Sequence, residues 1–265
     1  MRKISKPTLR TMRSMTILVA LTATMAVGLA SAQQPAPQPQ QAPQIAPPKA
    51  YKPLSVKAPQ PSTDAAFAAF RKQLADIAQK KDRAALQKLV VTKGFFWEGE
   101  GGDHGNPKAS SFDNFAKAVS LDDKDGSGWD ILSAAAQEPT LEADEDHKGV
   151  MCGPASPQID EQSLVALIKD TGTDADEWAF PNADKLEVRA EPKADAAVSE
   201  TLGQVLVRVY PEDNNSTEPQ TMLRIVTPSG KLGYVPMMAV LPIVTDQLCY
   251  IKDAGGWKIA GYAGG

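Results

Sequence analysis

A change in hydrophobic period near residue 184 divides the chain into two kinds of structure. From Ser62 to about residue 170, large apolar residues recur at spacings of three and four, as on the buried face of packed helices. From Asp184 onward they recur at every second position, in short runs broken by Gly, Pro and Asn, which is typical of β-strands. The sequence therefore predicts an α+β chain, with a mostly helical domain over residues 62–178 and a β-rich part after it.

The last residues, 243–265, predict a C-terminal β-hairpin. Two β-rich runs, Leu248–Lys252 and Trp257–Tyr262, flank a four-residue turn that contains Gly255 and Gly256. The short strands that precede this hairpin, over residues 184–242, predict a small barrel. The pattern leaves open which of the two domains the hairpin completes.

The first 32 residues have the three parts of a secretory signal peptide. Five basic residues lie within residues 1–15, an apolar run without charges spans residues 16–29, and Ala30-Ser31-Ala32 supplies small residues for cleavage before Gln33. That run is 14 residues long, fewer than the roughly 20 that a helix needs to cross a bilayer. We therefore expect a periplasmic or secreted protein, with no membrane insertion after the signal is cleaved.

Residues 33–61 predict a disordered linker. They contain nine prolines and seven glutamines but few large apolar side chains. Such a segment cannot bury enough apolar surface to offset the conformational entropy that it would lose on ordering.

Two cysteines, Cys152 and Cys249, are present in the chain. In an oxidising compartment such a pair is more often a disulfide than two free thiols. A bridge between them would stabilise the fold by on the order of 4 to 5 kcal/mol in the chain-entropy model. We therefore predict a Cys152–Cys249 disulfide that ties the end of the chain to its middle.

The charge of the chain argues against nucleic acid as a partner. Five of the 28 Lys and Arg residues lie in the signal, which leaves 23 against 32 Asp and Glu and a net charge near −9. Phosphate binding needs clustered Lys and Arg, and no such cluster remains after cleavage. An anionic membrane surface is disfavoured for the same reason.

Two acidic segments invite a metal-site hypothesis. Asp122–Gly128 resembles part of a twelve-residue calcium-binding loop. With Gly126 at the sixth position of such a loop, however, Leu121 and Leu132 occupy the first and twelfth positions, where carboxylates are needed. Asp144–His147 offers four potential ligands, yet adjacent side chains in a loop rarely converge on one ion. The sequence therefore predicts no metal site, and it implies no organic cofactor.

No catalytic constellation is evident in the sequence. The Gly-x-Ser-x-Gly motif of serine hydrolases is absent, and His104 beside Asp103 has no identifiable nucleophile. We therefore expect a protein that is not an enzyme.

Two short motifs bracket the β-rich part of the chain. Leu186–Pro192 contains a Val-Arg-x-x-Pro segment, and Gly230–Val235 reads Gly-x-x-Gly-Tyr-Val. Over residues 184–242 the chain thereby resembles the bacterial SH3-like (Src-homology-3-like) family, although Tyr234 stands where the family usually has tryptophan. The resemblance implies a small SH3-like β-barrel.

The same resemblance implies a binding function. Family members in exported proteins are thought to recognise cell-wall peptides or other proteins, so a peptidoglycan peptide or an envelope protein is the expected partner. We expect Tyr210, Arg224 and Tyr234 to contact it, because tyrosine rings offer flat apolar contact and a guanidinium pairs with a carboxylate. The alternative that the Tyr234 side chain is buried in the core stays open. The sequence does not determine the oligomeric state.

Two alternative functions remain open at this point. One is a cell-wall cysteine peptidase or amidase that uses Cys152, since such enzymes often carry an SH3-like barrel; their nucleophile normally begins a helix, with the histidine later in the chain. Here Gly153 and Pro154 follow Cys152, and both histidines precede it. The other is a structural or inhibitory partner of another periplasmic protein, docked through the helical domain.

Overall fold

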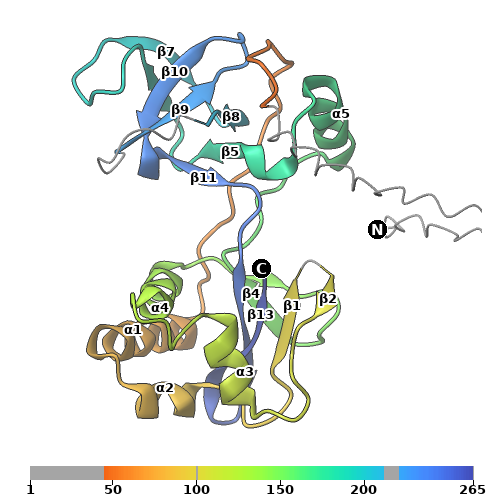
Figure 1. The fold of residues 1–265 in the computed structure, drawn as a ribbon, viewed down its shortest axis with the longest axis vertical. Helices are drawn as coiled ribbons and strands as arrows, with labels where there is room; N and C mark the ends of the chain where they lie inside the picture. The colour runs from red at the N-terminus through yellow and green to blue at the C-terminus, as the bar shows by residue number, and fades with distance from the viewer. Residues whose placement is uncertain (1–44, 100, 212–220, 265) are drawn as a thin grey trace, which may run out of the picture. The chain divides into compact units, whose positions relative to one another are not determined.

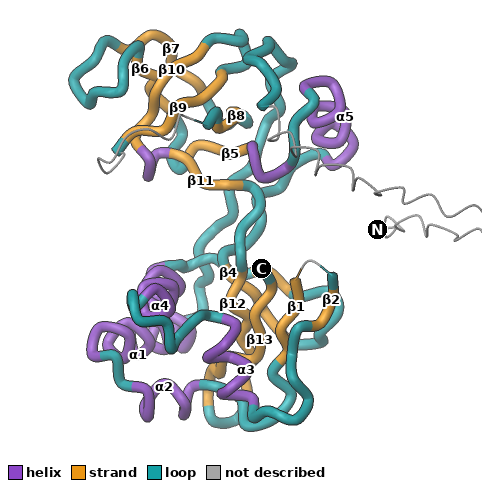
Figure 2. The backbone as a smooth tube through the Cα atoms, viewed as in Figure 1, coloured by secondary structure: helices purple, strands orange, loops and turns teal. Residues whose placement is uncertain are grey.

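The computed structural model describes residues 45–99, 101–211 and 221–264. Residues 45–265 form one compact unit, and the described part of it contains five α-helices and two β-sheets, of six and seven strands (Figures 1 and 2). The predicted signal peptide, residues 1–32, and the first part of the predicted linker, residues 33–44, lie outside the described residues. Within the described ranges, no helix is both long and apolar enough to cross a membrane.

The six-stranded sheet combines strands from the middle and the end of the chain. Its order is β2-β1-β13-β12-β4-β3, and all neighbours are antiparallel except β1 and β13, which run parallel. The strands are β1 (Phe96–Gly99), β2 (Gly102–Asp103), β3 (Glu142–Ala143), β4 (Val150–Gly153), β12 (Gln247–Asp253) and β13 (Gly256–Ala263). The C-terminal hairpin, β12 and β13, therefore lies in the centre of this sheet.

Four helices pack with the six-stranded sheet into one apolar core. They are α1 (Ala65–Lys80), α2 (Arg83–Leu89), α3 (Ser111–Ala118) and α4 (Ser127–Gln137). The Asp64 carboxylate begins α1 by accepting hydrogen bonds from two backbone N–H groups. The Asp82 carboxylate and the Ser110 hydroxyl each accept one such hydrogen bond at the starts of α2 and α3.

The core between α1 and the hairpin is aromatic. Phe67 packs edge-on against Tyr250 and Trp257, with ring centroids 5.3 and 5.2 Å apart, and Phe70 also meets Tyr250 at 5.6 Å. Such pairs contribute about 0.5–1.5 kcal/mol each beyond the burial of their area. Burial raises the pKa of the Tyr250 hydroxyl, so the side chain is a neutral phenol at physiological pH.

The disulfide lies on the other face of the sheet. Cys152 of β4 and Cys249 of β12 are directly opposite each other in the antiparallel register, and their sulfurs are bonded. The predicted pairing is therefore confirmed. Nearby, Gly261 of β13 lies beside Phe96 of β1, where a Cβ would lie 2.2 Å from the Phe96 ring, so only glycine fits.

The seven-stranded sheet has the order β11-β5-β8-β9-β10-β6-β7, and all its pairings are antiparallel. Its strands are β5 (Trp178–Pro181), β6 (Leu186–Arg189), β7 (Val198–Leu202), β8 (Val207–Val209), β9 (Met222–Val226), β10 (Leu232–Pro236) and β11 (Val240–Pro242). Helix α5 (Glu161–Thr171) and the 3-10 turn Ala175–Glu177 precede β5, and a second 3-10 turn, Met237–Ala239, precedes β11. One apolar core of this sheet contains Val188, Val207, Ile225 and Val235.

Part of residues 45–61 packs against the seven-stranded sheet, although the sequence predicts a linker there, and Pro61 at the end of the segment forms a bridge with Thr140. Ser55 forms a bridge with Val205, and Val56 is buried beside Trp178 and Leu206. The Tyr51 hydroxyl donates to the carbonyls of Leu206 and Val226, each at 3.0 Å. Tyr51, Leu54 and Val56 of this proline-rich segment thus pack into one apolar core, whereas Ile45 is exposed.

The predicted fold class is wrong. Four strands, β1 to β4, lie between the helices of residues 62–178 and share a sheet with the end of the chain, so these residues are not a mostly helical domain of their own. The predicted C-terminal hairpin is present as β12 and β13, and it completes this six-stranded sheet. In place of a clear small SH3-like barrel, the structure has a seven-stranded sheet that extends beyond residues 184–242 to include β5. Short strands of two to four residues carry too little periodicity to reveal which distant segment pairs with them.

The Cys152–Cys249 disulfide closes a long loop of the chain. Removing it therefore tests how much it contributes to the free energy of unfolding. The two cysteines are 97 residues apart, and the chain-entropy model gives about 4–5 kcal/mol for a loop of that length. We expect the C152A/C249A variant to lose about that much free energy of unfolding, measured by urea denaturation, with wild type in dithiothreitol as the matched comparison. A loss under about 1 kcal/mol, or two free thiols per chain in denatured, unreduced protein, would contradict the assignment.

Candidate functional site

Five side chains line one face of the seven-stranded sheet, and we call them the arginine–tyrosine strip: Arg189, Arg208, Tyr210, Arg224 and Tyr234. Tyr234 of β10 is directly opposite Arg224 of β9 on one side and Arg189 of β6 on the other. Directly opposite residues of neighbouring strands share a face of the sheet. The register therefore gathers Tyr210, Arg224 and Tyr234, the three residues that the sequence proposed as a binding site.

Tyr210 lies between two guanidinium groups. Its backbone N–H donates to the carbonyl of Arg224 at 2.8 Å, and its ring centroid is 4.8 Å from the Cζ of Arg224 and 5.2 Å from the Cζ of Arg208. Each such cation–π contact contributes about 0.5–1 kcal/mol at an exposed site and more when desolvated. Tyr210, Arg224 and Tyr234 are all half-buried, so they are held in place while part of each faces solvent.

Arg208 has a structural role within the strip. It is 2% exposed, and its Nε and Nη2 both donate to one carboxylate oxygen of Glu177, at 2.9 and 2.7 Å. Its Nη1 also donates to the carbonyl of Pro47 at 3.3 Å. The charge of Arg208 is thus neutralised inside the protein and is not available to a ligand.

Arg224 is bonded differently. Its Nη2 donates to the carbonyl of Pro211, while its buried Nε has no hydrogen-bond partner. None of the ion pairs between described residues includes Arg224. Since a guanidinium has five N–H donors, Arg224 keeps donor capacity that Arg208 has already used.

Tyr51 fixes the other end of this face. It packs edge-on against Trp178, with ring centroids 5.0 Å apart, and Trp178 is directly opposite Arg208 in the sheet. Burial raises the pKa of the Tyr51 hydroxyl, which remains protonated and can donate to backbone carbonyls. The segment around Tyr51 therefore covers the end of the face where Trp178 and Arg208 lie, whereas Tyr210, Arg224 and Tyr234 are half-buried.

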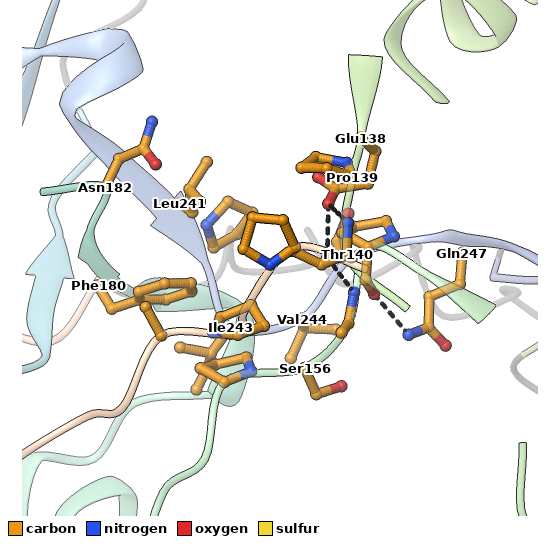
Figure 3. A pocket seen from close by; sticks show the side chains of 18 residues that line it. Glu138, Pro139, Thr140, Ser156, Phe180, Asn182, Leu241, Ile243, Val244 and Gln247 are labelled. Atoms are coloured by element: carbon orange, nitrogen blue, oxygen red, sulfur yellow. Dashed lines mark hydrogen bonds between the residues drawn. The ribbon is translucent and has the colours of Figure 1, made fainter. Parts of the chain in front are cut away.

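A second candidate is an apolar cavity of about 520 Å³ (Figure 3). Phe180, Leu241 and Ile243 form apolar walls, and six prolines also line it: Pro59, Pro61, Pro139, Pro154, Pro157 and Pro242. Its polar groups already bind one another, because the Glu138 carboxylate accepts from the N–H and hydroxyl of Thr140 at 2.7 and 2.5 Å. The cavity can take an apolar group but presents few free partners for a polar one.

The four acidic or imidazole side chains of residues 144–147 do not converge as one ligand set. Asp144 and His147 do meet, with Oδ1 and Nδ1 2.9 Å apart, and the His147 ring stacks on Phe96 at 3.8 Å. Asp144 instead forms a group with Cys152 and Cys249, in which one ligand atom from each residue lies within 4.8 Å of the other two. Sequence reasoning missed this group because its members come from three separate segments.

The remaining candidates have local structural roles. In the segment Asp122–Gly128, Asp122 pairs with Arg83, and the Asp125 carboxylate accepts a hydrogen bond from the Ser127 N–H at the start of α4. That hydrogen bond lowers the pKa of the Asp125 carboxyl. His104 contacts the Trp97 ring, with centroids 5.5 Å apart.

Comparisons with protein-family models, with curated proteins and with solved structures found no match for this chain. The resemblance of residues 184–242 to the SH3-like family therefore stays a prediction from those residues alone.

The ion pair between Arg208 of the strip and Glu177 provides a test of how rigidly the strip is held. Replacing Glu177 with Gln leaves the Arg208 guanidinium buried without its counter-charge, and breaking such a pair is strongly destabilising. We expect E177Q to lower the free energy of unfolding by about 3 kcal/mol, measured by urea denaturation. The matched control is E191Q, which removes an exposed carboxylate from Lys193 and should cost less than about 1 kcal/mol. Equal losses for the two variants would show that the buried pair does not organise this face.

Proposed function

We propose that this protein is a non-catalytic binding protein of the cell envelope, whose arginine–tyrosine strip holds a carboxylate-bearing peptide. The observation that carries the proposal is the Arg224–Tyr234 pair, placed directly opposite each other on β9 and β10 with the Tyr210 ring 4.8 Å from the guanidinium. A guanidinium binds a carboxylate through paired hydrogen bonds, and the tyrosines add flat apolar contact with a hydroxyl at the edge.

Location in the envelope is supported by two features of the chain. The first 32 residues have the composition of a secretory signal peptide, and disulfides such as Cys152–Cys249 persist mainly in oxidising compartments. Peptides of the cell wall, which carry free carboxylates, are then the ligand class that fits both the compartment and Arg224.

The cysteine peptidase alternative fits the structure less well. A cysteine nucleophile must be a thiolate, but the Cys152 sulfur is bonded to Cys249. Cys152 also lies in β4 and not at a helix start, so no helix dipole acts on it.

An envelope protein as the partner remains the second candidate. The apolar cavity favours it, since Phe180, Leu241 and Ile243 could receive an apolar side chain from a protein surface. The two candidates use different residues, so variants in the strip and in the cavity distinguish them.

The proposal predicts which residues respond to a muropeptide. In a titration of isotope-labelled protein followed by nuclear magnetic resonance, we expect the signals of Tyr210, Arg224 and Tyr234 to shift. The R224A variant should bind at least about tenfold more weakly, because a hydrogen bond to a charged group contributes roughly 1.5–3 kcal/mol.

The control for this titration is R83A. Arg83 also lies over an aromatic ring, 5.0 Å from the centroid of Phe112, but it is on α2 and outside the strip. R83A should bind like wild type. Signals of the strip that stay unmoved at saturating muropeptide would overturn the cell-wall proposal, and shifts confined to the residues that line the cavity would favour the protein-partner alternative.

A further inference from the structure

Three potential metal ligands from separate segments converge beside the six-stranded sheet. One carboxylate oxygen of Asp144 and the sulfurs of Cys152 and Cys249 all lie within 4.8 Å of one another. The β4–β12 register brings the two cysteines together. Asp144 directly follows β3, whose Ala143 pairs with Met151 of β4, so the same sheet positions all three side chains.

The Asp144 carboxylate is oriented by its own turn. Its Oδ1 accepts from the backbone N–H of Asp146 at 3.0 Å and lies 2.9 Å from Nδ1 of His147. Its Oδ2 is turned the other way and lies 3.8 Å from Sγ of Cys152. One oxygen is therefore committed to the turn, while the other faces the sulfurs.

A small cavity leads to this group. Its volume is about 280 Å³, and it is lined by Glu142, Ala143, Asp144, Glu145, Cys152 and Gln247. Three of these residues carry carboxylates, which attract cations. An ion can thus reach Asp144 and Cys152 from solvent, even though both cysteines are buried.

We propose that reduction of the Cys152–Cys249 disulfide converts this group into a Zn²⁺ site formed by the two thiolates and Asp144. A dithiol reductant supplies two electrons and two protons; the S–S bond breaks, two thiols form, and the reductant becomes a cyclic disulfide. Zn²⁺ then displaces the two thiol protons to solvent as its two bonds to sulfur form. The oxidised protein has no thiolate to offer and does not form the site.

The donor set selects the metal. Two thiolates and one carboxylate suit Zn²⁺, whereas Ca²⁺ and Mg²⁺ require oxygen ligands. Tetrahedral zinc holds such ligands at roughly 2.0–2.3 Å, which places the ligand atoms about 3.3–3.8 Å from one another. The Asp144 Oδ2 already lies 3.8 Å from the Cys152 sulfur. The two sulfurs, which are bonded to each other in the oxidised protein, would move apart to that spacing after reduction, and the fourth position would open toward the cavity.

Burial adds a reason for the reduced pair to take up a cation. Cys152 is 2% exposed and Cys249 is fully buried. A buried thiolate without a compensating charge is costly, and a divalent ion removes that cost for both sulfurs at once. The site therefore couples the redox state of the pair to metal binding.

The test compares reduced and oxidised protein. Full-length mature protein is treated anaerobically with a phosphine reductant, and Co²⁺ is added as a spectroscopic substitute for Zn²⁺. We expect thiolate-to-cobalt charge-transfer absorption in the reduced protein only, with one metal ion per chain by elemental analysis and displacement by Zn²⁺. The D144N variant should bind at least about tenfold more weakly, whereas E191Q, which changes an exposed carboxylate outside this cavity, should bind like wild type.

Each of several results would overturn the proposal. These are the absence of the charge-transfer band in reduced protein, equal metal binding by the oxidised protein, and equal affinity of D144N and wild type. If the reduced chain loses its circular dichroism signal, Zn²⁺ should restore it, because a ligand that binds only the folded state stabilises that state. Failure of Zn²⁺ to restore the signal would count equally against the site.

Discussion

The pairing of the C-terminal hairpin with β1 and β4 is the constraint on which the six-stranded sheet depends. Strands β12 and β13 occupy its centre, so the sheet is complete only when the end of the chain has joined its middle. The hairpin also contributes side chains to both faces of this sheet. Tyr250 and Trp257 pack against α1 on one face, and Cys249 bonds to Cys152 on the other. Bringing such distant segments together costs conformational entropy of the chain. The disulfide lowers the entropy of the unfolded chain, so less entropy is lost when the protein folds.

The seven-stranded sheet depends on buried polar groups that are each matched by a partner. Arg208 is neutralised by Glu177, and the Tyr51 hydroxyl binds two backbone carbonyls. Because unpaired polar groups in such positions are costly, these contacts favour one arrangement of residues 45–61 over others. The same contacts separate two otherwise similar arginines, since Arg208 is committed to the fold while Arg224 retains donors at the edge of the strip.

Sequence periodicity predicted the helices of the first part well and its strands poorly. Apolar residues at spacings of three and four predicted helices between Ser62 and about residue 170, where α1 to α5 lie, because helix signals are local. The strands are short, and their partners lie far away in the chain, as in the pairing of β4 with β12. A pattern read over a few residues carries no information on such pairing, so the predicted fold class was wrong although the cysteine pairing was right.

By itself, the sequence determined the helical spacing of the first part of the chain, the disulfide between the only two cysteines, and the chemical character of Tyr210, Arg224 and Tyr234. Tertiary structure decided which groups meet. It placed Arg208 in the core, paired with Glu177, and it brought Asp144 to the cysteine pair. The physical reason is that side-chain type follows from the residue alone, whereas contact, burial and charge neutralisation follow from strand register, which only the assembled sheets establish.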